Sequence, residues 1–393
     1  MLIIVHYGEI ALKGDNRAIF EDKLVENIKK SLQKQGIVFK LVKRLFGRII
    51  IETELQGTEC LANCKALGAL QNVFGIANFA VAQQCDKNIE KIKEKASDIL
   101  SQKDFKTFKV EAKRSDKNFP FTSQQVNELV GEAVLKIKNQ KLKISVNLEN
   151  PDITLYIEIT QNNVFLYTEK IQGPGGLPVG ISGKAICLIS GGIDSPVAAW
   201  QMMKRGVEVI FVHFFSEQEG YKQTLGKVRD LLRILSNFQP QGVKVYFAPF
   251  SDIQKEILLK TQEDLRVVLY RRFMFRVAEE IAKKELAKAL ITGENVGQVA
   301  SQTLDNMLAT SEATSLLVLR PLAGWDKIEI INIAKKIHTF EISILPHLDC
   351  CTMFTPKHPA TKANLANVKK QEKKLKIKKL ISTALKTSTL ENI

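Results

Sequence analysis

A short glycine loop between a strand and a helix constrains this chain more than any other feature. The loop reads Ser190-Gly191-Gly192-Ile193-Asp194-Ser195, and it follows the apolar run Ala185–Ile189. Residues 196–205 have the composition of a helix. Glycines allow positive φ angles and close approach of a ligand, and the free N–H groups at a helix N-terminus attract anions. The sequence therefore predicts a phosphate-binding turn at residues 190–195.

The pattern of this loop separates two classes of nucleotide site. It is not a Walker A loop, because no lysine follows Gly192. Ser-Gly-Gly-x-Asp-Ser instead resembles the PP-loop of ATP pyrophosphatases, which implies cleavage of ATP between the α and β phosphates. The structural alternative is an ordinary tight turn in which Asp194 or Ser195 only caps the helix. The full six-residue pattern after a buried strand favours the phosphate site.

Apolar strands and helices alternate after residue 184, which predicts a doubly wound parallel sheet of the α/β class. The expected strands are Ala185–Ile189, Val207–Phe215, Val243–Ala248 and Ala289–Thr292. Residues 1–60 and 61–168 mix shorter strands and helices, which predicts two smaller α+β domains, the first of them ferredoxin-like. Glycines and prolines crowd residues 172–180, so we expect a linker over residues 169–183. The α/β domain then covers residues 184–393.

Charge and cysteine content indicate which partners and which compartment the protein has. The net charge of +15 favours a polyanionic partner. A lysine-rich stretch at residues 369–379 is either a basic helix that binds phosphates or a solvated, frayed tail. No run reaches the roughly 18 apolar residues of a membrane span, and the N-terminus lacks a basic leader. The six cysteines are irregularly spaced, which predicts the reducing cytoplasm and no zinc site.

Ligands of doubly wound sheets bind at the carboxyl ends of the strands, and this rule selects the candidate residues. One strand ends at His213 and Phe214, and a later one ends before Gly293. Phe214 is either a platform for adenine or an ordinary core residue. Arg271 lies among apolar residues, so its partner is either a triphosphate or a structural carboxylate. Lys327 begins a helix against the helix dipole, which indicates a nearby phosphate.

Two adjacent cysteines, Cys350 and Cys351, lie in a polar segment flanked by Pro346 and His347. A thiolate is the nucleophilic form of cysteine, and nearby cations lower its pKa. Buried, inert thiols are the alternative. Adjacent cysteines in such a loop favour reactive thiols.

Taken together, the motifs resemble the tRNA 4-thiouridine synthetase family, the ThiI family of tRNA sulfurtransferases, which is also linked to thiazole formation for thiamine. The resemblance rests on residues 7–17, the linker motif at 173–180, the glycine loop, residues 293–306 and residues 349–352. It implies that residues 61–168 form a THUMP domain that binds the tRNA acceptor end. It also implies that ATP contacts the loop residues Ser190, Gly191, Gly192 and Ser195. The further ATP contacts that it implies are Leu188, Ile189, His213, Phe214, Arg271, Gly293 and Gln302. The implied catalytic residues are Asp194, Lys327 and Cys350, with Cys351 as the adjacent alternative; no residue is assigned to a metal.

The same resemblance implies partners and a reaction. ATP with Mg²⁺ adenylates O4 of a tRNA uridine, at position 8 in the family, and a persulfide then supplies the sulfur. The segment after Cys351 is too short for the C-terminal rhodanese domain of many members, so we expect Cys350 to receive sulfur directly from a cysteine desulfurase. A sulfur carrier protein of the thiazole pathway and a homodimer are further expectations; a membrane is not. The rival interpretations are another PP-loop enzyme, such as a 2-thiouridine, lysidine or amide-forming ligase, and a non-enzymatic tRNA-binding module.

Overall fold

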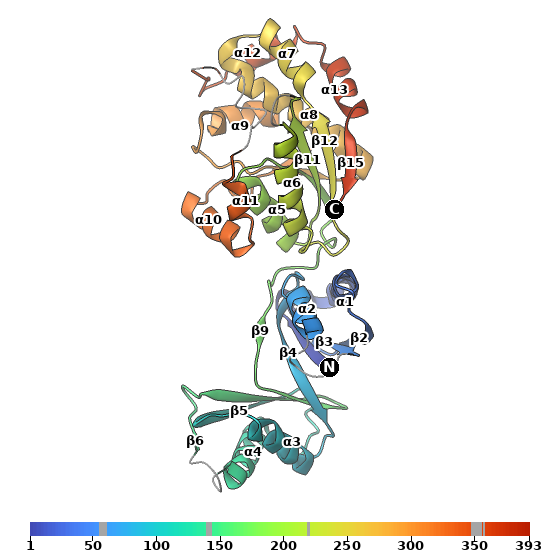
Figure 1. Cartoon of the computed structure of the whole chain (residues 1–393), viewed down its shortest axis with the longest axis vertical. Helices are drawn as coiled ribbons and strands as arrows, with labels where there is room; N and C mark the ends of the chain where they lie inside the picture. The colour runs from blue at the N-terminus through green and yellow to red at the C-terminus, as the bar shows by residue number, and fades with distance from the viewer. Residues whose placement is uncertain (55–60, 139–143, 218–220, 347–355, 357) are drawn as a thin grey trace. The chain divides into compact units, whose positions relative to one another are not determined.

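The computed structural model describes residues 1–54, 61–138, 144–217, 221–346, 356 and 358–393. These residues form two compact units. The first unit contains Met1–Gln71 and Gly75–Gly175, and the second contains Asn72–Phe74 and Gly176–Ile393. Figure 1 shows the elements of both, and each unit is described by itself.

The first unit begins with a ferredoxin-like arrangement. Its elements are β1 (Leu2–Tyr7), α1 (Arg17–Lys34), β2 (Phe39–Leu45), β3 (Arg48–Thr53), α2 (Leu61–Leu70) and β4 (Ile76–Cys85). The strand order is β2-β3-β1-β4, and β1 is antiparallel to both of its neighbours. This four-strand order is complete only with β4, which lies beyond the boundary expected at residue 60.

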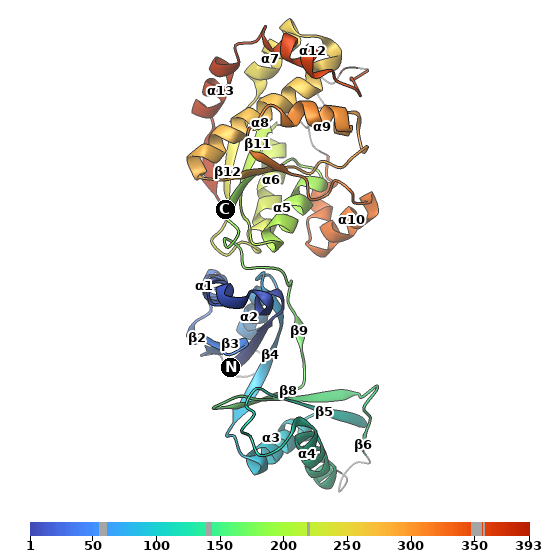
Figure 2. The same cartoon turned by 180° about the vertical axis from the view of Figure 1, so that it is seen from behind.

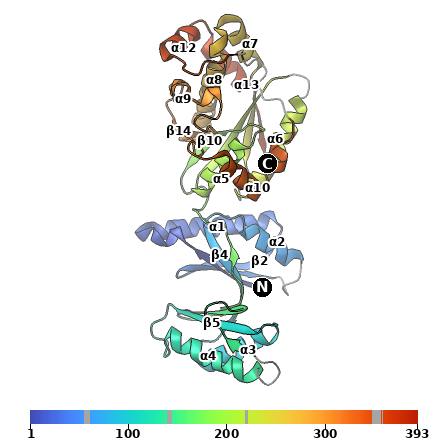
Figure 3. The ribbon, with the colours of Figure 1, turned by 90° about the vertical axis from the view of Figure 1, so that its left-hand side faces the viewer.

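The sheet of the first unit continues through β4 into a second α+β part. Its elements are α3 (Ile89–Ser101), β5 (Thr107–Arg114), α4 (Ser123–Lys138), β6 (Ser145–Val146), β7 (Ile153–Ile159), β8 (Val164–Tyr167) and β9 (Ile171–Gln172). The end of β4 pairs with β8, and the order continues β8-β7-β5-β6. Figure 3 shows α3 and α4 side by side on these strands, where the apolar faces of both helices close one core.

The second unit is the expected doubly wound sheet. Its strands are β10 (Lys184–Leu188), β11 (Glu208–Phe215), β12 (Lys244–Pro249), β13 (Ala289–Ile291), β14 (Leu317–Leu319) and β15 (Thr389–Asn392). The order is β14-β13-β10-β11-β12-β15, with β15 antiparallel to β12 and every other pair parallel. Successive side chains of β10 alternate between two separate cores, because neighbouring residues of a strand point to opposite faces.

Helices cover both faces of this sheet. They are α5 (Asp194–Lys204), α6 (Tyr221–Leu235), α7 (Ser251–Lys260), α8 (Arg266–Glu285), α9 (Leu304–Ser311), α10 (Lys327–Lys336), α11 (Phe340–Ser343), α12 (Leu365–Glu372) and α13 (Ile377–Lys386). One face packs against α5, α6 and α10, and the other against α7, α8, α12 and α13, as Figures 1 and 2 show from opposite sides. No helix in the described ranges is long and apolar enough to cross a membrane.

The C-terminal segment is folded, so fraying, one of the alternatives left open for residues 369–379, is not observed. The lysine-rich stretch is also not one helix, because it is divided between α12, a turn and α13. After α13 the chain adds β15 to the edge of the sheet, and Ile393 and Val243 exchange backbone hydrogen bonds at 2.9 Å. The backbone groups of β15 are hydrogen-bonded to β12 rather than to solvent, and this explains why the end of the chain is ordered.

The glycine-rich segment before β10 has a defined conformation in both units. In the first unit, a Cβ on Gly173 would lie 2.3 Å from the carbonyl oxygen of Ile76, so only glycine fits there. In the second unit, Gly176 has φ +75° and a Cβ would lie 2.2 Å from the oxygen of Lys204. The glycines therefore allow close backbone packing at these two positions, in addition to any role as a linker.

Candidate active site

The two strands that flank the switch in strand order define the candidate site. β10 lies between β11 and β13 in the sheet. From β10 the chain continues to β11 on one side, and from β13 it continues to β14 on the other, so the strand order reverses between β10 and β13. Parallel strands end at the same edge, and ligands of such sheets bind outside the carboxyl ends at this point. The glycine loop follows β10, and Gly293 follows β13.

The glycine loop is closed by its two serines. The backbone N–H of Ser190 donates to Oγ of Ser195 at 2.9 Å, and the two hydroxyl oxygens lie 3.1 Å apart. The N–H of Gly192 donates to Oγ of Ser190 at 3.3 Å. These contacts join the end of β10 to the first turn of α5, so the loop is held at the positive end of a helix.

Gly293 packs directly on this loop. A Cβ at Gly293 would lie 2.7 Å from the backbone nitrogen of Ser195 and 2.9 Å from the carbonyl carbon of Asp194. Neither backbone atom can yield as a flexible side chain would. The contact therefore requires glycine, and it holds the residue that follows β13 against the first turn of α5.

Asp194 brings together three elements of the site. Its carboxylate forms an ion pair with Nζ of Lys327, the first residue of α10. Its other oxygen accepts a hydrogen bond from Nε2 of Gln298 at 3.1 Å. Asp326 and Glu329 form a capping box at the start of α10, which holds Lys327 at the helix N-terminus. The structure thus places the two expected catalytic residues in contact.

Arg271 is paired with a carboxylate of the protein. This is the second of the two partners that the sequence left open, a triphosphate or a structural carboxylate. Its Nη2 lies 3.1 Å from Oε1 of Glu294, which is fully buried. The other carboxylate oxygen accepts from Nε of Arg320 at 2.6 Å and from Oγ1 of Thr292 at 3.0 Å. Burial alone would raise the pKa of Glu294, but the charges of Arg271 and Arg320 hold it below its ordinary value. Glu294 therefore stays ionised and orients both arginines.

The remaining residues that were expected to contact ATP differ in their surroundings. Nδ1 of His213 lies 2.9 Å from the carbonyl oxygen of Ile189, which joins the ends of β11 and β10. The side chain of Phe214 is buried in the core edge-on to Phe250, so the core interpretation of this side chain is the one observed. Gln302 is buried, and in the described part of the chain its Oε1 has no hydrogen-bond partner. Leu188 is half-buried and Ile189 is buried.

Cys350 and Cys351 lie outside the described residues. Of the described thiols, Cys187 is fully buried, and burial raises its pKa; burial also raises the pKa of Cys85, to about 11. Neither is activated as a nucleophile. Within the described ranges, no group of three His, Cys, Asp or Glu side chains is placed to hold a metal ion.

Two charged residues of the second unit were not singled out from the sequence. Arg320 directly follows β14, an edge strand of three residues that was not expected; with that strand known, the strand-end rule would have selected it. Lys227 on α6 is buried, and its Nζ donates to the carbonyl oxygens of Ser343 at 2.9 Å and Leu345 at 2.6 Å. It therefore anchors the segment that leads to the cysteines. A lysine on the apolar face of the expected helix 221–235 was the signal available in the sequence.

Comparison with known proteins accounts for most of the chain. The family model described as "Thiamine biosynthesis protein (ThiI)" matches residues 180–377, a THUMP domain matches residues 86–169, and the ThiI ferredoxin-like domain matches residues 2–80. A "Probable tRNA sulfurtransferase" of Thermoanaerobacter sp. (strain X514) is 46% identical, with 97% of each chain covered. Another, of Moorella thermoacetica, is 43% identical and covers 98% of this chain and 95% of its own.

Solved structures give the same result. A crystal structure of a 4-thiouridine synthetase–RNA complex with bound ATP is 37% identical, covers 100% of this chain and 99% of its own, and has a TM-score of 0.88. A protein of Pyrococcus horikoshii Ot3 is 26% identical over 86% of this chain and 99% of its own, with a TM-score of 0.67. The order of ferredoxin-like, THUMP and PP-loop domains and the full-length identity lead to one conclusion: this chain belongs to the ThiI family of tRNA sulfurtransferases.

Proposed function

We propose that this chain is an ATP-dependent enzyme that converts a tRNA uridine, at position 8 by family resemblance, into 4-thiouridine. The observation that carries the proposal is the meeting of the glycine loop, Gly293 and the Asp194–Lys327 pair at the switch point of the sheet. The similarity to a 4-thiouridine synthetase solved with RNA and ATP supports the choice of substrates.

The first step activates the uridine. O4 attacks the α-phosphorus of ATP, the bond to the β-phosphate breaks, and pyrophosphate leaves into the glycine loop. Backbone N–H groups at the start of α5 and the cations of Lys327 and Arg271 stabilise the charge that develops on the phosphates. The product is an adenylated uridine, in which AMP is a good leaving group. Leu188, Ile189, His213, the main chain at Phe214 and Gln302 complete the nucleotide site in this proposal.

The donor set at this site fits Mg²⁺. This cation is commonly bound through one or two carboxylates, substrate phosphates and water, and Asp194 supplies a half-exposed carboxylate beside the loop. When bound, Mg²⁺ offsets the negative charge of the triphosphate. The pairing with Lys327 and Gln298 orients the Asp194 carboxylate.

The second step replaces oxygen by sulfur. The terminal sulfur of a Cys350 persulfide attacks C4 of the adenylated uridine, and AMP leaves with the former O4. The thiolate of Cys351 then attacks the Cys350 sulfur, which forms a disulfide and releases the 4-thiouridine sulfur. An external reductant restores both thiols. We also propose a cysteine desulfurase as the persulfide donor, binding of tRNA by residues 1–168, a homodimer and a cytoplasmic location.

Mass spectrometry of tRNA nucleosides from a deletion strain tests this function. We expect 4-thiouridine to disappear and to return when the gene is restored. Loss of 2-thiouridine or lysidine instead would assign the chain to another PP-loop activity. Growth of the same strain without thiamine tests the thiazole role and a sulfur carrier protein as partner.

The Cys350→Ala variant separates the two steps. We expect it to keep tRNA-dependent formation of AMP and pyrophosphate and to lose thiolation. Full thiolation by this variant would remove Cys350 from the mechanism. Absence of AMP formation by the unmodified protein, with tRNA and a sulfur donor present, would instead support a binding module.

A further inference from the structure

A cluster of exposed lysines lies where α12 turns into α13, far along the chain from the residues of the ATP site. We call it the tail surface, and its exposed members are Lys370, Lys373, Lys374, Lys376, Lys378 and Lys379. They fall within ten consecutive positions that span the end of one helix, a turn and the start of the next. The candidate active site uses none of them.

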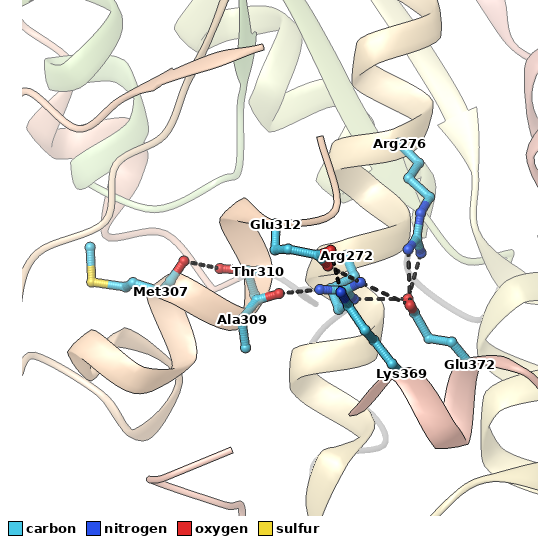
Figure 4. A network of polar contacts seen from close by, with 8 residues as sticks. All are labelled: Arg272, Arg276, Met307, Ala309, Thr310, Glu312, Lys369 and Glu372. Carbon is cyan, nitrogen blue, oxygen red and sulfur yellow. Dashed lines mark hydrogen bonds and ion pairs between the residues drawn. The ribbon is translucent and has the colours of Figure 1, made fainter. Parts of the chain in front are cut away.

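The single acid in this stretch is buried and paired with arginines of α8. Glu372 is 5% exposed, and both its oxygens accept hydrogen bonds from Arg272 and Arg276 of α8. Figure 4 shows this carboxylate between the two guanidinium groups. Glu372 therefore anchors α12 to α8. A second carboxylate, Glu256 of α7, accepts a hydrogen bond from the backbone N–H of Lys376 at 2.9 Å and pairs with Lys260, so the six exposed lysines still outnumber these two acids. Lys369, at the border, is paired with Glu312 at 2.7 Å and is not counted in the surface.

The local backbone adds to the positive potential. Lys376 is the N-cap of α13, and Lys378 and Lys379 lie in its first turn. Cations at this end of a helix oppose the helix dipole, so the protein concentrates positive charge at a place where the backbone is already positive. The surface is also hollowed: a concavity of about 640 Å³ is lined by Lys373, Lys376, Lys378 and Lys379, together with Lys369, Glu372, Leu375 and Ile377.

The chemistry of this surface fits phosphate groups better than a protein partner. Residues 365–379 contain no aromatic residue and no arginine, whereas Trp, Tyr and Arg dominate the binding energy of protein interfaces. They also lack the aromatic rings on which unpaired bases stack. Lysine is a flexible point charge that contacts phosphates without reading bases.

We propose that the tail surface binds the phosphate backbone of the tRNA substrate. The inference rests on the proposed function, because tRNA is the polyanion which that function brings to the chain. The surface contributes affinity and no sequence preference. It makes the C-terminal helices part of the tRNA-binding apparatus in addition to the THUMP domain.

Equilibrium binding of tRNA over a range of salt concentrations tests the proposal. The tail variant carries K373Q, K376Q and K379Q. The matched control carries K283Q, K284Q and K288Q, three exposed lysines between the last turn of α8 and the amino end of β13, at the edge of the sheet opposite the glycine loop. We expect the tail variant to bind about tenfold more weakly at low salt and its log–log salt slope to fall by about 2 to 3. The control should stay within about twofold of the unmodified protein.

Further measurements distinguish the possible failures. Thermal unfolding and ATP binding of the tail variant should match the unmodified protein, and the KM for tRNA should rise while kcat is retained. Unchanged tRNA affinity and salt slope would overturn the proposal. Normal tRNA binding with loss of persulfide transfer from the desulfurase would also overturn it, and would assign the surface to that protein. If the unmodified chain makes no 4-thiouridine but the binding difference persists, the proposed function fails and the RNA surface stands.

Discussion

Gly293 and Ser195 follow neighbouring parallel strands, and a Cβ on Gly293 would stand 2.7 Å from the Ser195 nitrogen. We predict that Gly293→Ala displaces the glycine loop, because the nearest atoms are backbone. A displacement of about 1 Å at a reacting centre can lower a rate about 100-fold, and we expect a loss of that order in tRNA-dependent AMP formation. Gly226→Ala is the matched control, since that position on α6 is open and alanine favours helix. Equal activity of both variants would contradict the role of the close contact.

The Asp194–Lys327 pair predicts a loss of activity without loss of stability. Both side chains are partly exposed, at 21% and 41%, so the pair contributes at most about 1 kcal/mol to folding. Lys327→Ala should nevertheless lower AMP formation about 100-fold or more, because the proposed mechanism uses this cation to stabilise the developing phosphate charge. Lys336→Ala, at the exposed far end of α10, is the control. Steady-state rates and thermal unfolding together check this prediction, and parallel losses in both would count against it.

The contacts of Glu372 predict that its substitution destabilises the fold more than substitution of Glu312, the other carboxylate beside Arg272. Glu372→Gln takes from Arg272, which is 1% exposed, the more buried of its two carboxylate partners, and removing one partner of a buried pair costs up to about 3–5 kcal/mol. Glu312→Gln, at a side chain 37% exposed, should cost about 1 kcal/mol or less. Urea unfolding of the second unit measures both. Similar values for the two variants would show that the buried fork around Arg272 does not hold α12 on α8.

A buried carboxylate in the first unit predicts a pH dependence of stability. Burial would raise the pKa of Glu158, but the hydrogen bond and charge of His6 and the charge of Arg48 lower it to about 2. A depressed pKa stabilises the fold at pH values above the unfolded pKa of about 4.3, and this stability is lost as pH falls towards 2. The expected loss is about 3 kcal/mol. Unfolding of the isolated residues 1–175 between pH 2 and 7 measures it, and Glu158→Gln should flatten the curve. A steep curve in that variant would assign the effect to other groups.

Lys227 predicts a separation of the two half-reactions. Its buried ammonium donates to the carbonyl oxygens of Ser343 and Leu345, just before the segment with Cys350 and Cys351. Lys227→Met keeps the apolar stem and removes both hydrogen bonds. We expect sulfur transfer to fall about tenfold while AMP formation is retained, because two lost hydrogen bonds at about 1 kcal/mol each loosen the segment. Lys222→Met, at an exposed position of α6, is the control. A matched loss in both half-reactions would contradict a local role.

Local patterns carried most of what could be predicted. The glycine loop, the strand before it and the helix after it are adjacent in sequence, so their pattern already specifies the turn. The alternation of strands and helices likewise predicted the parallel sheet. Elements stabilised by distant partners were missed: β14 has three residues and β15 has four, and each depends on a neighbour far away in the chain. Periodicity does not identify segments that short.

The arginines of α8 show that the partner of a single side chain cannot be predicted from the sequence. Arg271 and Arg272 are adjacent, and the sequence selected Arg271 from the family resemblance but left its partner open. Adjacent helical residues point about 100° apart, so only packing decides that Arg271 meets Glu294 while Arg272 meets Glu372. Phe214 was ambiguous for the same reason, because a strand-end aromatic can face either the ligand edge or the core.

By itself, the sequence determined the class of the fold and the position of the glycine loop, since these follow from short patterns in contiguous segments, and the family resemblance added the candidate catalytic residues. The tertiary structure decided which of these residues meet. It placed Lys327 on Asp194, 133 positions apart in the chain, and packed Gly293 on Ser195. It also turned Glu372 inward and left the lysines of the tail surface outside. Such pairings depend on the order of the strands and on the packing of helices against them, and no local pattern encodes either.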